Sequence, residues 1–197
     1  MAELSIERIA QTALDLVDEE GVSAFTLRAV ARRLDVTPMA LYHHVADKAE
    51  LASLVVDTAM NMYPMDEPTG DWKEDLWLYS KWVRTIAKQS PATVHLRRAY
   101  QVWTPTTVRL TQIWTEHWHK SGLPADAIEK AALTSAMSVY GMISEEVRMS
   151  EMEPSEVFIG KDQYPDLTSA LQTEAFSSEL FELSVRSIID GLVARLS

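Results

Sequence analysis

Side chains that can hydrogen-bond to DNA are crowded into one short stretch, VTPMALYHHVADK, from Val36 to Lys48. Threonine, tyrosine and histidine bond to phosphate oxygens without needing full charge, and lysine binds phosphate through its ammonium group. Methionine and alanine offer apolar contact to the methyl group of thymine. The chemistry that this stretch can perform is recognition of a DNA duplex.

The elements around the stretch predict how it is held. Apolar residues recur at helical spacing, and each expected helix has a start or stop signal. A helix over 6–20 follows Ser5 and stops at Gly21, a helix over 27–34 is capped by Thr26, and a helix over 37–44 is capped by Thr37 with Pro38 at its first position. Two short helices joined by a tight turn at residues 35–36 fit a helix-turn-helix.

The third helix has suitable dimensions for reading bases. At 1.5 Å per residue it is about 12 Å long, which is roughly the width of the major groove. Such a helix reads bases with its N-terminal residues and touches phosphate near its end. We expect DNA contacts from this helix, from the start of the preceding one and from the start of the following one, at Thr26, Arg28, Thr37, Met39, Ala40, Tyr42, His43 and Lys48.

The alternative is that part of this stretch is a solvated face with a packed aromatic residue. Leu41 and Val45 are assigned to the core. His43 and His44 point about 100° apart on a helix, so one of the two is expected to pack against the protein.

The charge of the chain is unevenly distributed. The 197 residues carry a formal net charge of -11, yet residues 26–48 hold four basic residues against two acidic ones. An acidic balance argues against non-specific binding to nucleic acid or anionic lipid, and a local basic island suits a small DNA-reading surface. There is no cysteine, no signal-peptide pattern and no run long enough to span a membrane, so we expect a cytoplasmic protein.

The rest of the chain also reads as helix, so the predicted fold class is all-α. Further helices are expected at 47–63, 71–88, 91–100, 105–121, 124–148 and 169–196, with a polar loop at 149–166. Prolines and a glycine in YPMDEPTGDW mark a boundary. The predicted organisation is a three-helix DNA-binding domain at 1–46, a connecting helix and linker at 47–70, and a larger ligand-binding and dimerisation domain at 71–197.

The stretch TLRAVARRLDVTPMALYHHVADKAEL resembles the TetR family of bacterial transcriptional regulators. DEPTGDWKEDL, SGLPADAIEKA and YGMISEE look like the branch whose C-terminal domain is similar to the tetracycline repressor. The resemblance implies a homodimer that represses transcription and releases a DNA operator when a small molecule binds. It carries DNA contacts over to Thr26, Arg28, Thr37, Pro38, Met39, Tyr42, His43, His44 and Lys48. Asp35 departs from the glycine usual in the family's turn, and aspartate tolerates a left-handed conformation better than most residues.

The second domain holds all six tryptophans, which either line a ligand cavity or fill a core or dimer interface. His95 and Glu145 fall where tetracycline repressors hold a metal–drug complex, but Met137 stands where those proteins have another histidine. We therefore expect an apolar or aromatic effector, with no metal and no cofactor. The candidate ligand-binding residues are Trp82, His95, Trp103, Trp114, Met137, Tyr140 and Glu145.

Two helices are candidates for the dimer interface. The helix at 124–148 is rich in small residues, and the last helix has an apolar stripe too broad for burial on one side. Pairing between two copies would form a four-helix bundle, whereas the alternative is a core within one chain. A ligand would then tilt the helix at 47–63, which changes the separation of the two recognition helices and their match to half-sites about 34–36 Å apart, or a multiple.

A metalloenzyme and a ligand-independent regulator are the two alternative functions. Glu116 to His119 reads EHWH, a Glu-x-x-His pattern used in di-iron helical bundles, but such sites need two copies and this chain has one. No G-x-S-x-G, phosphate loop or dinucleotide fingerprint is present, so we expect that the protein is not an enzyme. A ligand-independent regulator or activator of the same fold is the remaining alternative.

Overall fold

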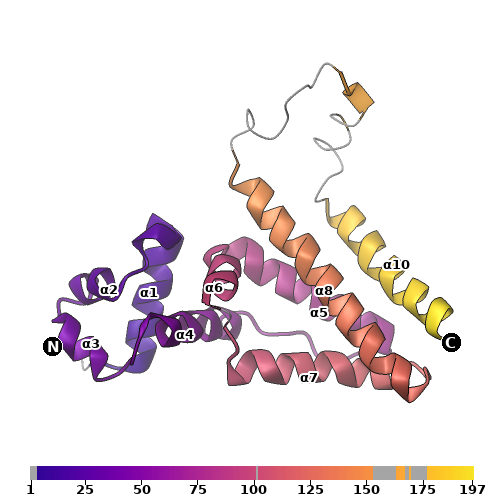
Figure 1. Ribbon diagram of the computed structural model, residues 1–197, viewed down its shortest axis with the longest axis horizontal. Coiled ribbons are helices and arrows are strands. Elements are labelled where there is room, and N and C mark those ends of the chain that lie inside the picture. The colour runs from indigo at the N-terminus through magenta and orange to yellow at the C-terminus, as the bar shows by residue number, and fades with distance from the viewer. Residues whose placement is uncertain (1–3, 101, 153–162, 167–168, 170–176) are drawn as a thin grey trace. The chain divides into compact units, whose positions relative to one another are not determined.

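The computed structural model describes residues 4–100, 102–152, 163–166, 169 and 177–197, and within these it contains helices and no strand (Figure 1). The predicted all-α class is confirmed. The helices are α1 (Ile6–Glu20), the short 3-10 helix η1 (Val22–Ala24), α2 (Leu27–Arg33), α3 (Pro38–Tyr42), α4 (Lys48–Asn61), α5 (Trp72–Gln89), α6 (Ala92–Tyr100), α7 (Pro105–His119), α8 (Ala125–Ser150) and α10 (Ser178–Leu196).

The first four α-helices begin where the predicted capping residues stand. In each case a side-chain oxygen accepts a hydrogen bond from a backbone N–H group in the first turn, which would otherwise have no partner in the helix. The pairs are Ser5 with Arg8, Thr26 with Ala29, Thr37 with Ala40, and Asp47 with Ala49 and Glu50. Pro38 occupies the first turn of α3, where its missing N–H group costs nothing.

The turn between α2 and α3 contains Asp35 in the left-handed conformation, with φ of 56°. Aspartate is one of the few non-glycine residues that adopt this region readily. The departure from glycine at this position is therefore compatible with the helix-turn-helix.

Several predicted helix bounds differ from the structure, mostly by one or two residues. The last helix begins at Ser178 rather than residue 169, because the Ser177 side chain accepts a hydrogen bond from the N–H of Leu180 and caps it. The helix α3 ends at Tyr42 instead of residue 44, and α8 continues to Ser150. Most of the loop predicted at 149–166 lies outside the described residues.

The packing divides the chain into two compact units, and the predicted domain bounds stay a prediction. One unit comprises Met1–Met65 with Thr85–Thr111, and the other comprises Asp66–Arg84 with Gln112–Ser197. The segment from Thr85 to Thr111 joins the N-terminal helices because α6 packs against α1 and α4. The predicted bounds follow chain order, whereas the packing brings a later helix into the unit that holds the helix-turn-helix.

In the second unit, a buried ion pair connects α5, α8 and α10. The guanidinium of Arg84 bonds to both carboxylate oxygens of Glu146, with Nε–Oε2 of 2.6 Å and Nη2–Oε1 of 2.8 Å. Less than a tenth of either side chain is exposed, at 8% and 9%. Arg84 also donates to the Ser178 hydroxyl at 3.3 Å and lies 4.6 Å from the ring centroid of Phe181.

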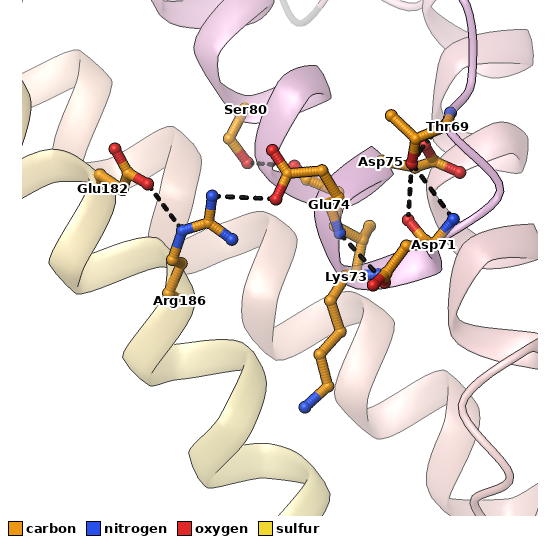
Figure 2. A network of polar contacts seen from close by, with 9 residues as sticks. Thr69, Asp71, Lys73, Glu74, Asp75, Ser80, Glu182 and Arg186 are labelled. Atoms are coloured by element: carbon orange, nitrogen blue, oxygen red, sulfur yellow. Dashed lines mark hydrogen bonds and ion pairs between the residues drawn. The ribbon is translucent and has the colours of Figure 1, made fainter.

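The start of α5 carries a second polar network, which is largely exposed (Figure 2). Arg186 of α10 bridges Glu182 and Glu74, and the Arg186 Nη2–Glu74 Oε2 distance is 2.9 Å. Lys73 pairs with Asp190, with an Nζ–Oδ1 distance of 2.6 Å. Exposed pairs of this kind stabilise a protein by about 0–1 kcal/mol, so the buried pair is the stronger constraint on these three helices.

Asp75 and His117 form a buried pair between α5 and α7. The Asp75 Oδ1 atom accepts hydrogen bonds from the Thr69 N–H at 2.6 Å and the Thr69 hydroxyl at 2.7 Å, which fastens the preceding loop to the helix. The other oxygen, Oδ2, lies 3.7 Å from Nδ1 of His117. Burial lowers the pKa of His117 below its usual 6.5, and the nearby Asp75 charge opposes this only in part.

Burial alone would raise the pKa of Asp75, but the hydrogen bonds from Thr69 and the charge of His117 lower it below its usual 3.8. The stabilising contribution of Asp75 is therefore present above that usual value and is lost as the pH falls through its lower pKa in the folded protein.

We predict that the Glu146→Ala variant loses about 3–5 kcal/mol of unfolding free energy, because it leaves Arg84 as a buried charge without its carboxylate. Urea denaturation followed by circular dichroism measures the loss. The matched control, Lys73→Ala, breaks an exposed pair and is expected to cost about 0–1 kcal/mol. The double variant Arg84→Met/Glu146→Met should recover most of the loss. Equal losses of unfolding free energy in Glu146→Ala and Lys73→Ala would contradict the assignment.

We also predict that stability falls between pH 7.5 and pH 5 in part through His117. The unfolded histidine takes up a proton near pH 6.5, whereas the folded one resists it, so protonation favours the unfolded state as the pH falls. The His117→Gln variant should show a shallower pH dependence of unfolding free energy than the wild type. His119→Gln, at an exposed position of the same helix, should retain the wild-type slope.

Candidate nucleic-acid interface and ligand-binding unit

The predicted DNA-contacting side chains lie on the surface of the first unit. Met39 and Tyr42 of α3 are exposed by 68% and 51%. Leu41 and Val45 are buried, as expected for the core side of the helix. The remaining exposed members of the set are Thr26, Arg28, Thr37, Pro38 and His43, and the half-buried members are Ala40, His44 and Lys48.

The two threonines of this surface combine two roles. Thr26 Oγ1 accepts from the N–H of Ala29 at 3.1 Å, and Thr37 Oγ1 accepts from the N–H of Ala40 at 3.2 Å. A hydroxyl that accepts a hydrogen bond keeps its own proton for donation. Both exposed hydroxyls can therefore cap a helix and donate to a phosphate or base acceptor at the same time.

The two adjacent histidines have different environments. His43 is exposed and His44 is half-buried. Because α3 ends at Tyr42, both histidines follow the helix, and the expected helical spacing of about 100° is not what separates their environments.

The basic residues of the island are not equivalent. Arg33 bonds to Glu19 and Glu20 at the end of α1, and the hydrogen bond with Glu19 is the main cause that raises its pKa. Arg28 and Arg32 are exposed. The local excess of positive charge counted along the sequence is thus reduced in the folded unit by acids that lie outside the counted window.

Lys48, the first residue of α4, contacts aromatic rings. Its ammonium nitrogen lies 5.4 Å from the ring centroid of Phe25 and 5.5 Å from that of Tyr100. Phe25 immediately precedes Thr26, and Tyr100 is the last residue of α6. The sequence does not predict this contact, because it depends on how α6 packs.

The segment around α6 is attached to the N-terminal helices by two hydroxyl groups that donate to carboxylates. The Ser90 hydroxyl donates to both oxygens of Asp18 on α1, at 2.8 and 2.9 Å. The Thr104 hydroxyl donates to Asp57 on α4. Partial burial raises the pKa of Asp18, and the Ser90 hydrogen bond opposes that rise.

Three tryptophans of the second unit, Trp82, Trp114 and Trp118, are linked through the Tyr79 ring and a shared hydrogen-bond acceptor, Ser135. The indole N–H of Trp114 donates to the carbonyl oxygen of Ala132 at 3.0 Å and to Ser135 Oγ at 3.2 Å, and the indole of Trp118 donates to the same Oγ at 3.0 Å. The Tyr79 ring contacts Trp82 and Trp114, with centroid distances of 5.8 and 5.3 Å.

The predicted ligand-binding residues occupy diverse environments. Trp114 is buried, and Trp82 is joined to it through Tyr79. Glu145 is half-exposed and bonds to Arg148, with Glu145 Oε2 at 2.8 Å from Nε. His95 and Tyr140 are half-buried, whereas Trp103 and Met137 are exposed by 69% and 67%. His95 and Trp103 belong to the first unit and the others to the second, so the ligand set stays a prediction.

Sequence reasoning did not predict the burial of the polar residues of the second unit, which among the described residues are Asp75, Ser80, Arg84, His117, Ser135 and Glu146. A signal existed for Ser135, because Trp114 and Trp118 are four residues apart, share a helix face and each need a hydrogen-bond acceptor when buried. The Glu116 to His119 pattern does not converge on further ligands: within the described part of the chain, no three His, Cys, Asp or Glu residues are placed to hold a metal ion. None of the described helices is long and apolar enough to cross a membrane.

Two family models match the chain. Residues 2–55 match that of the bacterial regulatory proteins of the tetR family, and residues 63–196 match the tetracyclin repressor-like C-terminal domain. The HTH-type transcriptional repressor DrrR1 of Streptomyces coeruleorubidus is 24% identical over 107 residues, which are 53% of this chain and 40% of that protein. The tetracycline repressor protein class E of Escherichia coli is 30% identical over 79 residues, 39% of this chain and 37% of that protein. The chain thus spans about two fifths of the length of these curated relatives.

Solved structures show the same fold over nearly the whole chain. The TetR family protein ActR of Streptomyces coelicolor, in complex with actinorhodin, has a TM-score of 0.79 at 24% identity and covers 100% of this chain and 99% of its own. BioQ with its double-stranded DNA operator has a TM-score of 0.74 at 23% identity, covering 98% and 99%. With both family models matched in chain order and the helix-turn-helix in place, the chain belongs to the TetR family of bacterial regulatory proteins.

Proposed function

We propose that the chain is a ligand-responsive transcriptional repressor that binds a palindromic operator as a homodimer and releases it when a small molecule binds. The observation that carries the proposal is the set of exposed hydrogen-bonding and apolar side chains on α3 and at the start of α2, together with the half-buried Lys48 at the start of α4. A surface that exposes Met39 and Tyr42 on a rigid, capped helix has the residue types for base and phosphate contacts. The relatives support the role, since DrrR1 is named a repressor and BioQ is solved with an operator.

The proposed homodimer rests on the apolar surface of α8 and α10, which pack against each other within the chain. Leu133 and Met137 of α8 are exposed by 63% and 67%, and Leu180 and Leu183 of α10 by 41% and 63%. Clustered exposure of this kind marks an interaction surface. Two such helices from each copy would form a four-helix bundle with two-fold symmetry.

Glycines on these two helices support the same interface. A Cβ atom added to Gly141 of α8 or Gly191 of α10 would meet nothing within 4 Å. A glycine in a helix interior costs about 0.5–1 kcal/mol relative to alanine. Because no contact among the described residues requires these glycines, close approach of a partner helix is the explanation that we favour.

The proposed effector is an apolar or aromatic small molecule. The second unit offers the connected rings of Tyr79, Trp82 and Trp114, and ActR is solved with actinorhodin. In the proposed mechanism, the ligand changes the tilt of α4 and with it the separation of the two recognition helices, which must match the half-sites. Ligand and operator then weaken each other's binding by the same factor.

We predict that Arg28→Gln weakens operator binding and lowers the salt slope of log Kd by about 0.9 for each protomer, because one phosphate contact is lost. Tyr42→Phe should weaken binding by about 0.5–1.5 kcal/mol for each protomer through one lost hydrogen bond. Fluorescence anisotropy at several salt concentrations measures both. Arg33→Gln removes the same charge from a residue held by Glu19 and Glu20 and should leave the slope unchanged. Equal effects of the two arginine variants would contradict a specific contact surface.

We predict that Leu183→Glu shifts the protein from dimer to monomer, because an unpaired charge would be buried in an apolar interface at a cost of several kcal/mol. Sedimentation velocity should show at least a tenfold weaker dimer, since each 1.4 kcal/mol is about tenfold. Val108→Glu provides the matched control, because Val108 is an exposed apolar residue, at 54%, on α7. A dimer that survives Leu183→Glu and dissociates with Val108→Glu would place the interface elsewhere.

A further inference from the structure

The ammonium group of Lys48 is enclosed by two aromatic rings that also contact each other. Its distances to the Phe25 and Tyr100 centroids are 5.4 and 5.5 Å, and the two rings meet edge to face, with centroids 6.1 Å apart and planes at 65°. Both distances lie within the range of about 6 Å in which a cation is attracted to a ring face. The two rings therefore favour one position of an otherwise flexible side chain.

The three residues come from different parts of the first unit. Phe25 is fully buried and directly precedes the cap of α2, so its ring is fixed by the core of the helix-turn-helix. Lys48 opens α4, directly after the α3 region. Tyr100 ends α6, which packs against α4 and lies beyond the helix-turn-helix in the sequence (Figure 1). The Tyr100 ring is thus the part of this cluster that moves if α6 moves.

A lysine on a free stem loses considerable rotamer freedom when it binds a phosphate. The contacts with the two rings remove part of that rotamer freedom before DNA binds. The ammonium group has three N–H donors, so contact with a ring leaves donors for an oxygen acceptor. Lys48 is half-buried, which leaves part of the side chain accessible to a phosphate.

We propose that Tyr100 is a positioning residue for DNA binding: its ring, with that of Phe25, holds Lys48 ready for a backbone phosphate. This inference rests on the proposed function, because it requires that Lys48 contacts DNA. It adds a direct route from α6 to the DNA-binding surface. The Ser90–Asp18 and Thr104–Asp57 hydrogen bonds hold the flanks of α6 against α1 and α4. A shift of the end of α6 relative to α4 would therefore move the Tyr100 ring with respect to Lys48.

A double-mutant cycle in the full-length protein tests the proposal, with Lys48→Met, Tyr100→Met and their combination. The probe is a fluorescent duplex selected from a random pool by the wild-type protein, and anisotropy gives Kd at several salt concentrations. Lys48→Met should weaken binding and lower the salt slope by about 0.9 for each protomer. Tyr100→Met should weaken binding by about 2- to 10-fold, lower the slope in the same direction, and have little further effect in the Lys48→Met background. Tyr100→Phe keeps the ring and should bind as the wild type does.

The possible outcomes separate this inference from the proposed function. If the wild type selects no sequence, or Lys48→Met changes neither Kd nor slope, the proposed DNA contact of Lys48 fails and the inference fails with it. If Lys48→Met weakens binding while Tyr100→Met has no effect, has the same effect in both backgrounds, or tightens binding, only the positioning role is overturned. Circular dichroism melting verifies that each variant is folded, and Tyr100→Phe tests for general effects of substitution at this position.

Discussion

Helix capping by short side chains is the interaction on which the N-terminal unit depends. Thr26, Thr37 and Asp47 each accept hydrogen bonds from backbone N–H groups in the first turn of the helix that follows. These caps decide where three successive helices begin and therefore where the chain turns between them. A capping threonine accepts with an oxygen lone pair and keeps its own proton. The hydroxyl groups of Thr26 and Thr37, which cap α2 and α3, can therefore still donate to an external acceptor. Fold and proposed recognition consequently share the same atoms.

The electrostatics of this surface are restrained. The chain as a whole is acidic, with a net charge of -11, and Arg33 is engaged by two glutamates of α1. Lys48 is held against aromatic rings. In the proposed dimer, such a surface would depend on neutral hydrogen-bond donors and on its duplication more than on a large positive field. The acidic remainder disfavours non-specific association with DNA. The exposed apolar residues and open glycines of α8 and α10 would provide that duplication.

The parts of the structure that could be predicted from the sequence are those determined locally. A cap acts over three residues, and the left-handed turn at Asp35 depends on one residue, so both were predictable. The start of α10 was missed because apolar residues continue at helical spacing before Ser177, and apart from this serine the sequence gives no sign that a helix begins there. The Arg84–Glu146 pair and the rings around Lys48 join residues far apart in the chain and depend on helix packing. Glu145 and Glu146 are adjacent, yet one is half-exposed and the other buried, which only the packing of α8 decides.

Selection from a random pool of DNA duplexes by the full-length protein, followed by sequencing, tests the central claim most directly. The account predicts enrichment of an inverted repeat whose half-site centres are one helical turn, about 34–36 Å, or a multiple of it apart. That symmetry would reflect two copies of the α3 surface acting together. Enrichment of no sequence, or of a single site without two-fold symmetry, would contradict a dimeric operator-binding repressor.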